Sequence, residues 1–470
     1  MIVKQLYTKC LSQGSYYIES NGEVAIIDPL REVQQYIDMA ESSNAKIKYI
    51  FETHFHADFV SGHLSLAERT QAQIIYGPNA NPEFECHIAR DNQEFIVGKI
   101  KLKVIHTPGH TLESTTYLLI DEQGKDHAIF TGDTLFLGDV GRPDLAQKSS
   151  MNENELAGIL YDSLRKKIMP LSDELIVYPG HGAGSACGKK MNSETTGTLG
   201  EQKKSNYALR ENMTKEEFIS EVNEGLLPPP AYFPYNVSLN KTGYQNIEKL
   251  IEKGINTLCP IEFEMTSEIR NCVILDVRHQ TEFAERHIPG SIFIGIDGSF
   301  APWVGSVLKD INQPILLVAN EERIEETVIR LSRVGFDNVV GVLCNDLDDW
   351  VNSGRDIESV NSESPSDWVE AFENSEVNVI DVRNESEHQS EHILNSINIP
   401  LNELTDRIDE IDFSKKTLIH CAGGYRSMIA CSLLKYKGHH DLIDIKGGYA
   451  TIKETKFPKS NFSCPSTLTN

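Results

Sequence analysis

The chain has 470 residues, of which 40% are hydrophobic and 24% are charged. At ~150 residues per domain, this length predicts about three domains with ordinary globular cores. The formal net charge of −25 disfavours binding to nucleic acid or to an anionic membrane surface, because both carry negative charge themselves. The nine cysteines form no C-x-x-C pair, and we find neither a signal peptide nor a long apolar span, so we expect a cytoplasmic protein with free thiols.

The first half of the chain alternates apolar runs with turn signals, and helical periodicity lies between some of these runs. We predict strands near residues 16–20, 24–28, 47–52, 73–76, 100–105, 115–120, 128–131 and 175–178, and helices near 33–41, 64–70 and 153–168. This alternation predicts a mixed α/β domain over residues 1–235. From Gly225 to Asn236 prolines are interleaved with aromatic residues, which is typical of an extended polyproline connector whose aromatic side chains pack on a neighbouring domain.

A candidate metal motif follows directly on the strand near Ile47 to Phe51. The motif reads Glu52-Thr53-His54-Phe55-His56-Ala57-Asp58, and its alternating polar side chains can converge on one point where a strand opens into a loop. Imidazole and carboxylate groups are standard ligands for divalent ions. The H-x-H-x-D pattern by itself is only moderately specific, since such histidines also cap and pack.

Three more polar residues stand at strand ends that enter glycine-containing turns. They are His110 in TPGHT, Asp133 in TGDT and His181 in PGHG. Glycine allows a tight turn, so the side chain can reach back over the end of the sheet. Structure alone does not readily explain so many ligand-type residues at equivalent positions, and the sequence therefore predicts a metal site.

The choice of ligands, and with it the metal, is open at this point. If His54, His110 and Asp133 bind, they form a 2-His-1-carboxylate face with open positions, as in non-haem Fe(II) sites that activate O₂. If His54, His56 and His110 bind, the site is of the catalytic zinc kind, with a bound water of lowered pKa that is suited to hydrolysis. Spacing along the chain permits both.

These residues, in this order, resemble the metallo-β-lactamase superfamily over roughly residues 1–225. The resemblance implies a four-layer αββα sandwich with its metal site at one sheet edge. The usual H-x-H-x-D-H motif of the superfamily would place histidine at position 59, where this chain has Phe59. A phenyl ring cannot bind a metal, so a second metal would keep only Asp58, His181 and a bridging Asp133. We therefore favour one metal per chain.

The second half of the chain contains an internal duplication. Asp276-Val277-Arg278 recurs as Asp381-Val382-Arg383, a separation of 105 positions. The same separation relates Glu282, His287, Ile288, Ser291, Ile292 and Ile294 to Glu387, His392, Ile393, Ser396, Ile397 and Ile399. Each copy continues with a buried-strand run, a helical stretch and another strand, which predicts two tandem α/β domains with parallel sheets, over residues 236–360 and 361–470. The polar run from Ser353 to Asp367 is the predicted linker between them.

A cysteine loop follows the strand predicted over Thr417 to His420 in the second copy. It reads Cys421-Ala422-Gly423-Gly424-Tyr425-Arg426 and leads into a predicted helix from Ser427 to Leu434. A cysteine at such a junction lies near backbone N–H groups and a helix N-terminus, while Arg426 adds a positive charge, and each effect favours an anionic sulfur. We predict that this loop stabilises a thiolate or a persulfide anion.

This loop matches C-x-x-G-x-R and, with Asp381-Val382-Arg383 and Gly447-Gly448, resembles rhodanese domains. The resemblance implies that Cys421 carries sulfane sulfur in a loop completed by Ala422, Gly423, Gly424 and Tyr425, with Arg426 as a further catalytic residue. The first copy has Ala319 where the nucleophile is expected. We therefore predict that the first copy is a catalytically silent rhodanese with a structural role as a spacer or docking surface.

Nearly the whole chain resembles the persulfide dioxygenase and rhodanese fusion proteins of bacterial sulfide detoxification. The resemblance implies one Fe(II) per chain, held by His54, His110 and Asp133, with His56, Asp58 and His181 orienting ligands or substrate. It implies oxidation of a small thiol persulfide by O₂ to sulfite, followed by sulfur transfer at Cys421 to give thiosulfate. The carrier thiol (glutathione, coenzyme A, bacillithiol or another) and the oligomeric state, a homo-oligomer included, are left open.

Cys187 lies six residues after His181 in a glycine-rich loop, and two interpretations of it are equally weighted. It is either a sulfur-handling catalytic residue at the mouth of the metal site or an ordinary loop thiol. Two other interpretations of the whole chain stand beside the dioxygenase. One is a zinc-dependent thioester hydrolase of the glyoxalase II type with appended sulfur carriers, and the other is a non-catalytic sulfur relay or sensor.

Overall fold

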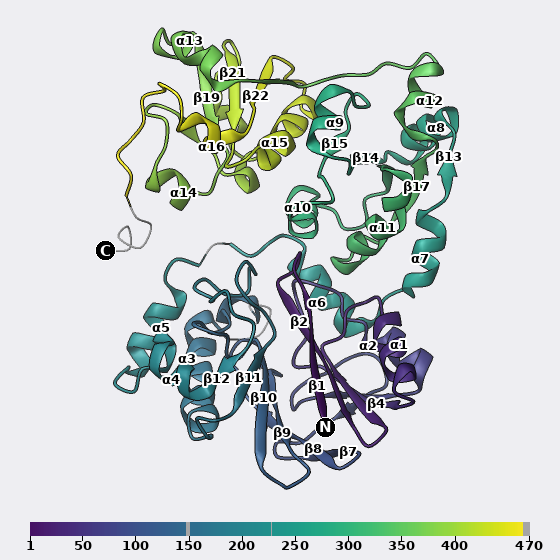
Figure 1. Cartoon of the computed structure of the whole chain (residues 1–470), viewed down its shortest axis with the longest axis vertical. Helices are drawn as coiled ribbons and strands as arrows, with labels where there is room; N and C mark the ends of the chain where they lie inside the picture. The colour runs from purple at the N-terminus through teal and green to yellow at the C-terminus, as the bar shows by residue number, and fades with distance from the viewer. Residues whose placement is uncertain (147–150, 227, 464–470) are drawn as a thin grey trace. The chain divides into compact units, whose positions relative to one another are not determined.

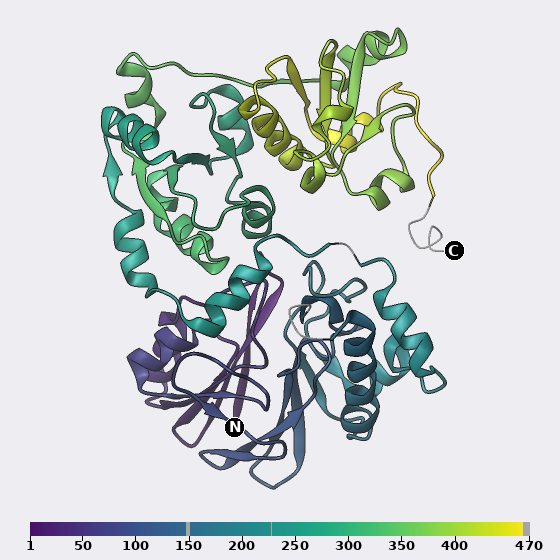
Figure 2. The same cartoon turned by 180° about the vertical axis from the view of Figure 1, so that it is seen from behind.

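The computed structural model describes residues 1–146, 151–226 and 228–463. The chain divides into two compact units, shown from opposite sides in Figures 1 and 2. Unit 1 comprises Met1–Lys249, Lys309–Ile311 and Ile329–Phe336, and unit 2 comprises Leu250–Leu308, Asn312–Val328 and Asp337–Asn470. None of the helices in the described ranges is both long enough and apolar enough to cross a membrane.

Unit 1 contains two six-stranded sheets. The first has the order β1 (Ile2–Thr8), β2 (Gln13–Ser20), β3 (Glu23–Ile27), β4 (Lys46–Phe51), β5 (Gln73–Tyr76) and β6 (His87–Ile88). The second has the order β12 (Gly197–Thr198), β11 (Ile176–Pro179), β10 (Asp126–Gly132), β9 (Thr115–Ile120), β8 (Ile100–His106) and β7 (Glu94–Val97). Every strand predicted in this half is present, whereas β1, β6, β7 and β12 were not predicted.

Helices cover the outer faces of these two sheets (Figure 1). They are α1 (Gln34–Ser42), α2 (His63–Thr70), α3 (Glu153–Ser163), α4 (Leu199–Ser205), α5 (Lys215–Asn223) and α6 (Phe233–Thr242). Apolar side chains of both sheets, such as Phe51 and Tyr117, form one core. Tyr36 of α1 packs on the outer face of the first sheet, and Leu160 of α3 packs on that of the second. The predicted αββα sandwich is confirmed.

Unit 2 contains two five-stranded sheets in which all strand pairs are parallel. The first copy of the duplication has the order β13 (Thr257–Leu258), β17 (Val339–Leu343), β16 (Ile315–Val318), β14 (Val273–Asp276) and β15 (Ile292–Phe293). The second copy has β18 (Asn361–Glu363), β22 (Leu442–Ile445), β21 (Lys416–His420), β19 (Val377–Asp381) and β20 (Ile397–Asn398). The two orders correspond strand by strand, so the duplication seen in the sequence is also a duplication of topology.

The remaining helices lie after residue 246. They are α7 (Ile247–Gly254), α8 (Pro260–Arg270), α9 (Gln280–Glu285), α10 (Phe300–Val307), α11 (Ile324–Arg333), α12 (Asp346–Asn352), α13 (Val369–Glu373), α14 (Glu385–Ser390), α15 (Tyr425–Tyr436) and α16 (Gly448–Ile452). The helix predicted from Ser427 to Leu434 is α15, and it begins two residues earlier than predicted. Cys421 therefore lies directly between β21 and the first turn of α15.

Two connecting segments differ from the prediction. The expected extended connector Gly225–Asn236 ends in helix α6, because Pro234 lies in the first helical turn, where its missing N–H has no partner to lose. Residue 227 of this connector lies outside the described residues. The expected linker Ser353–Asp367 contains β18, which pairs with β22. The predicted end of the first domain, residue 235, lies inside α6. The domain limits 1–235, 236–360 and 361–470 stay a prediction.

Candidate metal centre and thiol site

Six histidine and aspartate side chains meet at strand ends in unit 1. They are His54, His56 and Asp58 after β4, His110 after β8, Asp133 after β10 and His181 after β11. Each is between 1% and 5% exposed. The approach of β11 to β10 requires glycine, since a Cβ at Gly180 would stand 2.5 Å from Oδ1 of Asp133. The strand-end pattern thus brings together all the residues that the sequence singled out for metal binding.

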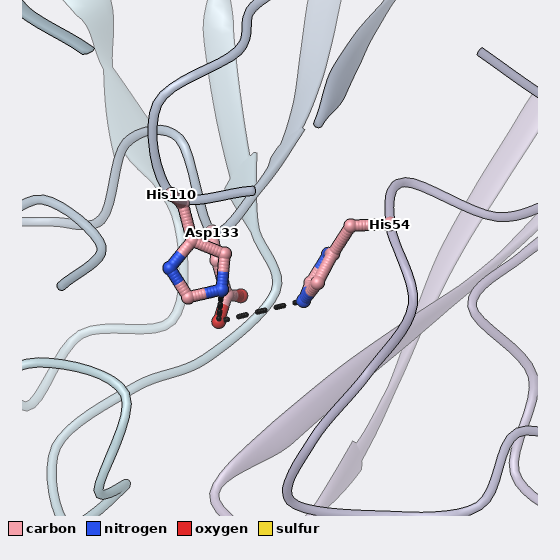
Figure 3. Close-up of side chains that lie close together, drawn as sticks. All are labelled: His54, His110 and Asp133. Atoms are coloured by element: carbon pink, nitrogen blue, oxygen red, sulfur yellow. Dashed lines mark ion pairs between the residues drawn. The ribbon is translucent and has the colours of Figure 1, made fainter. Parts of the chain in front are cut away.

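His54, His110 and Asp133 form the first ligand group (Figure 3). Oδ2 of Asp133 lies 3.8 Å from Nε2 of His54 and 3.5 Å from Nε2 of His110. Both oxygens of Asp133 are buried without a hydrogen-bond partner among the described residues. Burial, reinforced by the neighbouring imidazoles, lowers the pKa of His54 well below its usual value, so this ring is neutral near pH 7, as a ligand must be.

Hydrogen bonds on the far side of each ring fix which nitrogen carries the proton. The hydroxyl of Thr53 donates to Asp28, so its oxygen accepts from Nδ1 of His54 at 2.9 Å. Nδ1 of His110 donates to the carbonyl oxygen of Arg142 at 2.8 Å. Both Nε2 atoms therefore direct lone pairs toward Asp133. Three acceptor atoms facing one another without a proton between them would repel, and a bound cation removes that repulsion.

His56, Asp58 and His181 form a second group. Nε2 of His181 lies 3.4 Å from Asp58 and 3.6 Å from the other oxygen of Asp133, so Asp133 stands between the two groups. Phe59 is fully buried, and its ring centroid lies 4.3 Å from that of His56. The position that would hold a further ligand in the superfamily motif is therefore part of the apolar packing.

His56 also contacts two carboxylates to which the sequence analysis gave no role. Its Nε2 lies 3.1 Å from Asp28 and 3.4 Å from Glu52. Burial lowers the pKa of His56, but the charges of Asp28 and Glu52 outweigh burial and raise this pKa well above its usual value. The contacts of Nε2 with these two carboxylates compete with metal binding at this nitrogen. Asp28 is the last residue of the strand predicted near 24–28 and directly follows β3, so the same strand-end rule would have found it.

Cys187 is 1% exposed, and its Sγ lies within 4.8 Å of ligand atoms of Asp133 and His181. The thiol is buried beside the ligands and does not lie at the mouth of the site, and its sulfur-handling role stays a prediction. Burial, together with the charges of Asp58 and Asp133, raises the pKa of this thiol well above its usual value. Cys187 is thus a neutral thiol against the second group.

A pocket of about 580 Å³ opens beside His110, a volume within the usual range for small-molecule sites. It is lined by Phe55, Ala57, Asn79, Asn81, His110, Thr111, Leu112, Glu113, Asp144, Leu145, Pro229, Phe233, Pro234, Val237 and Lys241. Helix α6 supplies one wall, and its Asn240 donates to the carbonyl oxygens of His56 and Phe59 at 2.8 Å each. The segment predicted as a connector therefore belongs to the site.

Replacing Thr53 by valine is expected to weaken metal binding by roughly 10–100-fold. Valine has nearly the shape of threonine but offers no oxygen to Nδ1 of His54, so the ring can turn and lose the required tautomer. Competition with a metal chelator measures the affinity. Thr417→Val, a buried threonine in unit 2, is the matched control and should bind metal like the unmodified chain; an unchanged affinity in Thr53→Val would refute this role.

The thiol site in unit 2 lies where β21 ends. Cys421 is 1% exposed, and the N–H of Gly424 donates to its Sγ at 3.1 Å. Gly424 has a φ of +106°, a conformation that favours glycine. Arg426 makes a two-fold ion pair with Glu387 of α14, at 2.6 and 2.8 Å. Its positive charge is therefore partly neutralised, and the sequence analysis did not identify Glu387 as a partner.

The first copy of the duplication contributes to the surroundings of this loop. The hydroxyl of Tyr425 donates to the carbonyl oxygen of Gly295 at 2.6 Å, and a Cβ at Gly298 would stand 2.2 Å from the Tyr425 ring. The first copy keeps the buried pair of Asp276 and Arg278 at 2.6 Å but has no thiol at Ala319. The first copy thus contacts the Cys421 loop through Tyr425, and its role as a spacer or docking surface stays a prediction.

The comparisons with known proteins match this architecture. A family model described as the metallo-beta-lactamase superfamily matches residues 9–181, and one described as the rhodanese-like domain matches residues 262–353 and 364–455. The crystal structure of a metallo-beta-lactamase from Staphylococcus aureus subsp. aureus COL is 31% identical, with a TM-score of 0.64, and the match covers 73% of this chain and 98% of that one. This chain belongs to the metallo-beta-lactamase superfamily and carries two rhodanese-like domains.

Curated relatives of the metallo-beta-lactamase domain have different activities. A cytoplasmic hydroxyacylglutathione hydrolase of Arabidopsis thaliana is 30% identical over 184 residues, which are 38% of this chain and 67% of that protein. The mitochondrial persulfide dioxygenase ETHE1 of Bos taurus is 27% identical over 221 residues, 46% of this chain and 78% of that protein. The chain spans only 58–60% of three further hydrolases that it matches. Family membership thus leaves both reactions as candidates.

Proposed function

We propose that the chain is an Fe(II)-dependent persulfide dioxygenase with an attached rhodanese sulfurtransferase. The observation that supports this most is the first ligand group, in which His54, His110 and Asp133 present one acceptor atom each. Two imidazoles and one carboxylate with open positions are typical of non-haem Fe(II) oxygenases. Fe(II) bound there would supply a centre at which O₂ and a persulfide react.

The residues of the chain would hold, orient and shield the reactants. Thr53 and the carbonyl of Arg142 fix the two imidazoles, and the burial of all three ligands limits the access of water. The overall reaction of a persulfide, RSSH + O₂ + H₂O → RSH + SO₃²⁻ + 2H⁺, balances in atoms and charge. Cys187 lies beside the ligands as a neutral thiol, and we propose that it contacts the outer sulfur of the persulfide.

The pocket beside His110 is the proposed site of the thiol carrier. Its wall combines apolar side chains with the cation of Lys241 and the carboxylate of Glu113. Asp144 is already paired with Arg142 at 2.6 Å. Such a lining can hold the apolar part of a carrier and orient its charged groups.

The rhodanese site is the proposed site of the second reaction, sulfur transfer to sulfite. A Cys421 persulfide would transfer its outer sulfur to sulfite, so that Cys–SSH + SO₃²⁻ gives Cys–SH + S₂O₃²⁻. The buried loop and the N–H of Gly424 support an anionic sulfur at this position. All eight described cysteines are free, which accords with a reducing compartment, and we propose a cytoplasmic location.

A zinc-dependent thioester hydrolase is the second candidate. The group of His56, Asp58 and His181 favours it, because with Asp133 as a bridge it would complete a two-metal site. The hydroxyacylglutathione hydrolases among the relatives favour it as well. Phe59 and the pairing of His56 with Asp28 and Glu52 speak for one metal instead.

Metal stoichiometry separates the two candidates. The dioxygenase should bind one Fe(II) per chain tightly, with persulfide-dependent activity complete after one equivalent. The hydrolase should require two Zn(II) per chain and should cleave a glutathione thioester. We suggest anaerobic titration of metal-free protein followed by both assays; two tightly bound ions with thioester cleavage would refute the dioxygenase proposal.

A further inference from the structure

A short chain of hydrogen bonds leads away from Cys421 inside the second rhodanese copy. Sγ of Cys421 lies 3.6 Å from Oγ of Ser427, and this hydroxyl lies 2.6 Å from Oδ1 of Asp444. The other oxygen of Asp444 accepts from the hydroxyl of Ser362 at 2.8 Å. Cys421, Ser427 and Asp444 are at most 3% exposed, so water does not readily replace these contacts.

The direction of these hydrogen bonds follows from their chemistry. An ionised carboxylate only accepts, so the Ser427 hydroxyl donates to Asp444. This contact is shorter than the 3.1 Å to the carbonyl oxygen of Gly424, the other acceptor near the hydroxyl. A lone pair of Ser427 Oγ is then left to accept the S–H of Cys421. Cys421 is thus placed to give up its proton, Ser427 to pass a proton on and Asp444 to accept it.

The far end of this chain reaches a cavity. Asp444, Gly423 and Gly424 line a cavity of about 410 Å³, which Lys446 also lines. The thiol itself is 1% exposed. A proton that leaves the thiol through Ser427 can therefore pass to Asp444 and from there to solvent in the cavity.

The silent first copy provides an internal comparison. Ile419 pairs with Asp444 in the second copy, and Leu317 pairs with Val342 in the first. By this register Cys421, Ser427 and Asp444 correspond to Ala319, Glu325 and Val342, all 102 positions earlier. The buried pairs of Asp276 with Arg278 and of Asp381 with Arg383, by contrast, have the same 2.6 Å distance in both copies. The buried aspartate–arginine pair is thus present in both copies, with and without a thiol. The serine and the aspartate next to the thiol occur only in the copy that has the cysteine.

We propose that Ser427 and Asp444 form a proton relay that converts the Cys421 thiol into the attacking thiolate. The S–H bond breaks as its proton moves to Ser427 Oγ, while the Ser427 proton moves to Asp444. The thiolate attacks the outer sulfur of the donor, the sulfur–sulfur bond of the donor breaks, and its electron pair leaves with the donor thiolate or sulfite. The proton on Asp444 passes to the leaving group or to solvent. This inference rests on the proposed sulfurtransferase function.

The electrostatic surroundings support Asp444 as the base. Burial raises the pKa of Asp444, although the hydroxyls of Ser427 and Ser362 lower it in part, and a raised pKa makes a carboxylate a better base. The other charged or titratable groups on β18, β21 and α15, the elements next to β22, are Glu363, Lys416, His420, Tyr425, Arg426, Cys431, Lys435 and Tyr436. Lys446 follows β22, and Asp381, Arg383 and Glu387 belong to β19 and the segment after it. Arg426 is paired with Glu387, and Arg383 with Asp381. Asp444 is hydrogen-bonded to hydroxyls and faces the thiol through one of them.

The test is the pH profile of sulfur transfer from thiosulfate to cyanide by the full chain. Asp444→Asn should lower the rate by about 100-fold near neutral pH and should recover as pH rises, because hydroxide then removes the thiol proton. Ser427→Ala should behave alike, and Ser427→Thr, which keeps the hydroxyl, should restore activity. Asp441→Asn is the matched control, since its side chain is 72% exposed, and should follow the unmodified profile.

An Asp444→Asn profile that is lowered equally at every pH would overturn the relay, since a structural defect is not rescued by hydroxide. A second readout keeps the relay separate from the proposed function. The ultraviolet absorbance of the thiolate, taken as the difference from Cys421→Ser, reports ionisation without any sulfur substrate. If the unmodified chain transfers no sulfur, the sulfurtransferase proposal fails. The relay would still be supported if ionisation moves to higher pH in Asp444→Asn, and refuted if it does not.

Discussion

Replacing Asp133 by asparagine is expected to abolish metal binding and persulfide-dependent O₂ consumption together. Asp133 directs one oxygen at His54 and His110 and the other at His181. The amide keeps the shape but loses the charge and one of the two acceptor oxygens. Substitutions of outer partners typically cost 10–100-fold in metal affinity, so we expect a loss of at least about 100-fold for a direct ligand. Metal analysis after dialysis and O₂ uptake measure the two effects.

Asp58→Asn is the matched control for this substitution. Asp58 is also buried and lies 3.4 Å from His181, but it belongs to the second group. With one metal in the first group, Asp58→Asn should keep a full equivalent of iron. If it loses the metal while Asp133→Asn retains it, the assignment of the ligands is contradicted.

Replacing Cys421 by serine is expected to separate the two activities. O₂ consumption should remain within about two-fold of the unmodified rate, because the ligands lie in unit 1 and the thiol in unit 2, whereas thiosulfate formation should fall to background. A serine hydroxyl does not form a persulfide, so sulfite accumulates in its place. Parallel measurement of O₂, sulfite and thiosulfate tests this expectation.

Cys431→Ala supplies the control for the thiol. Cys431 is fully buried in α15, the helix that follows the Cys421 loop. Its removal should leave both sulfite and thiosulfate formation in place. Equal loss of O₂ consumption and thiosulfate formation in Cys421→Ser would contradict the model of two separate active sites.

The ligands were accessible to sequence reasoning because each stands at the end of a strand. Apolar runs bounded by turn signals located β4, β8, β10 and β11, and glycine next to His110, Asp133 and His181 marked the turns. The partners that orient the ligands were less accessible. A threonine hydroxyl or a backbone carbonyl, such as that of Arg142, carries no distinguishing pattern, and its role depends on packing between distant segments.

The rhodanese half shows the same division. The repeat predicted two matching parallel sheets, since one separation holds over many positions. The prediction of a silent first copy came from Ala319 at the position of the nucleophile. Two local features were missed for physical reasons. Pro234, in the segment before the rhodanese half, looked like part of an extended connector but lies in the first turn of helix α6, where proline is tolerated. Asp444 lies in a buried strand that reads as apolar, and only the fold brings it next to Ser427.

The most direct test of the dioxygenase proposal is O₂ uptake by protein loaded anaerobically with either Fe(II) or Zn(II). Glutathione persulfide and coenzyme A persulfide serve as the two substrates. We predict that the iron form takes up one O₂ per persulfide oxidised and that the zinc form takes up none. No uptake by the iron form with either substrate, together with thioester cleavage by the zinc form, would contradict the proposal and assign the metal centre to the hydrolases.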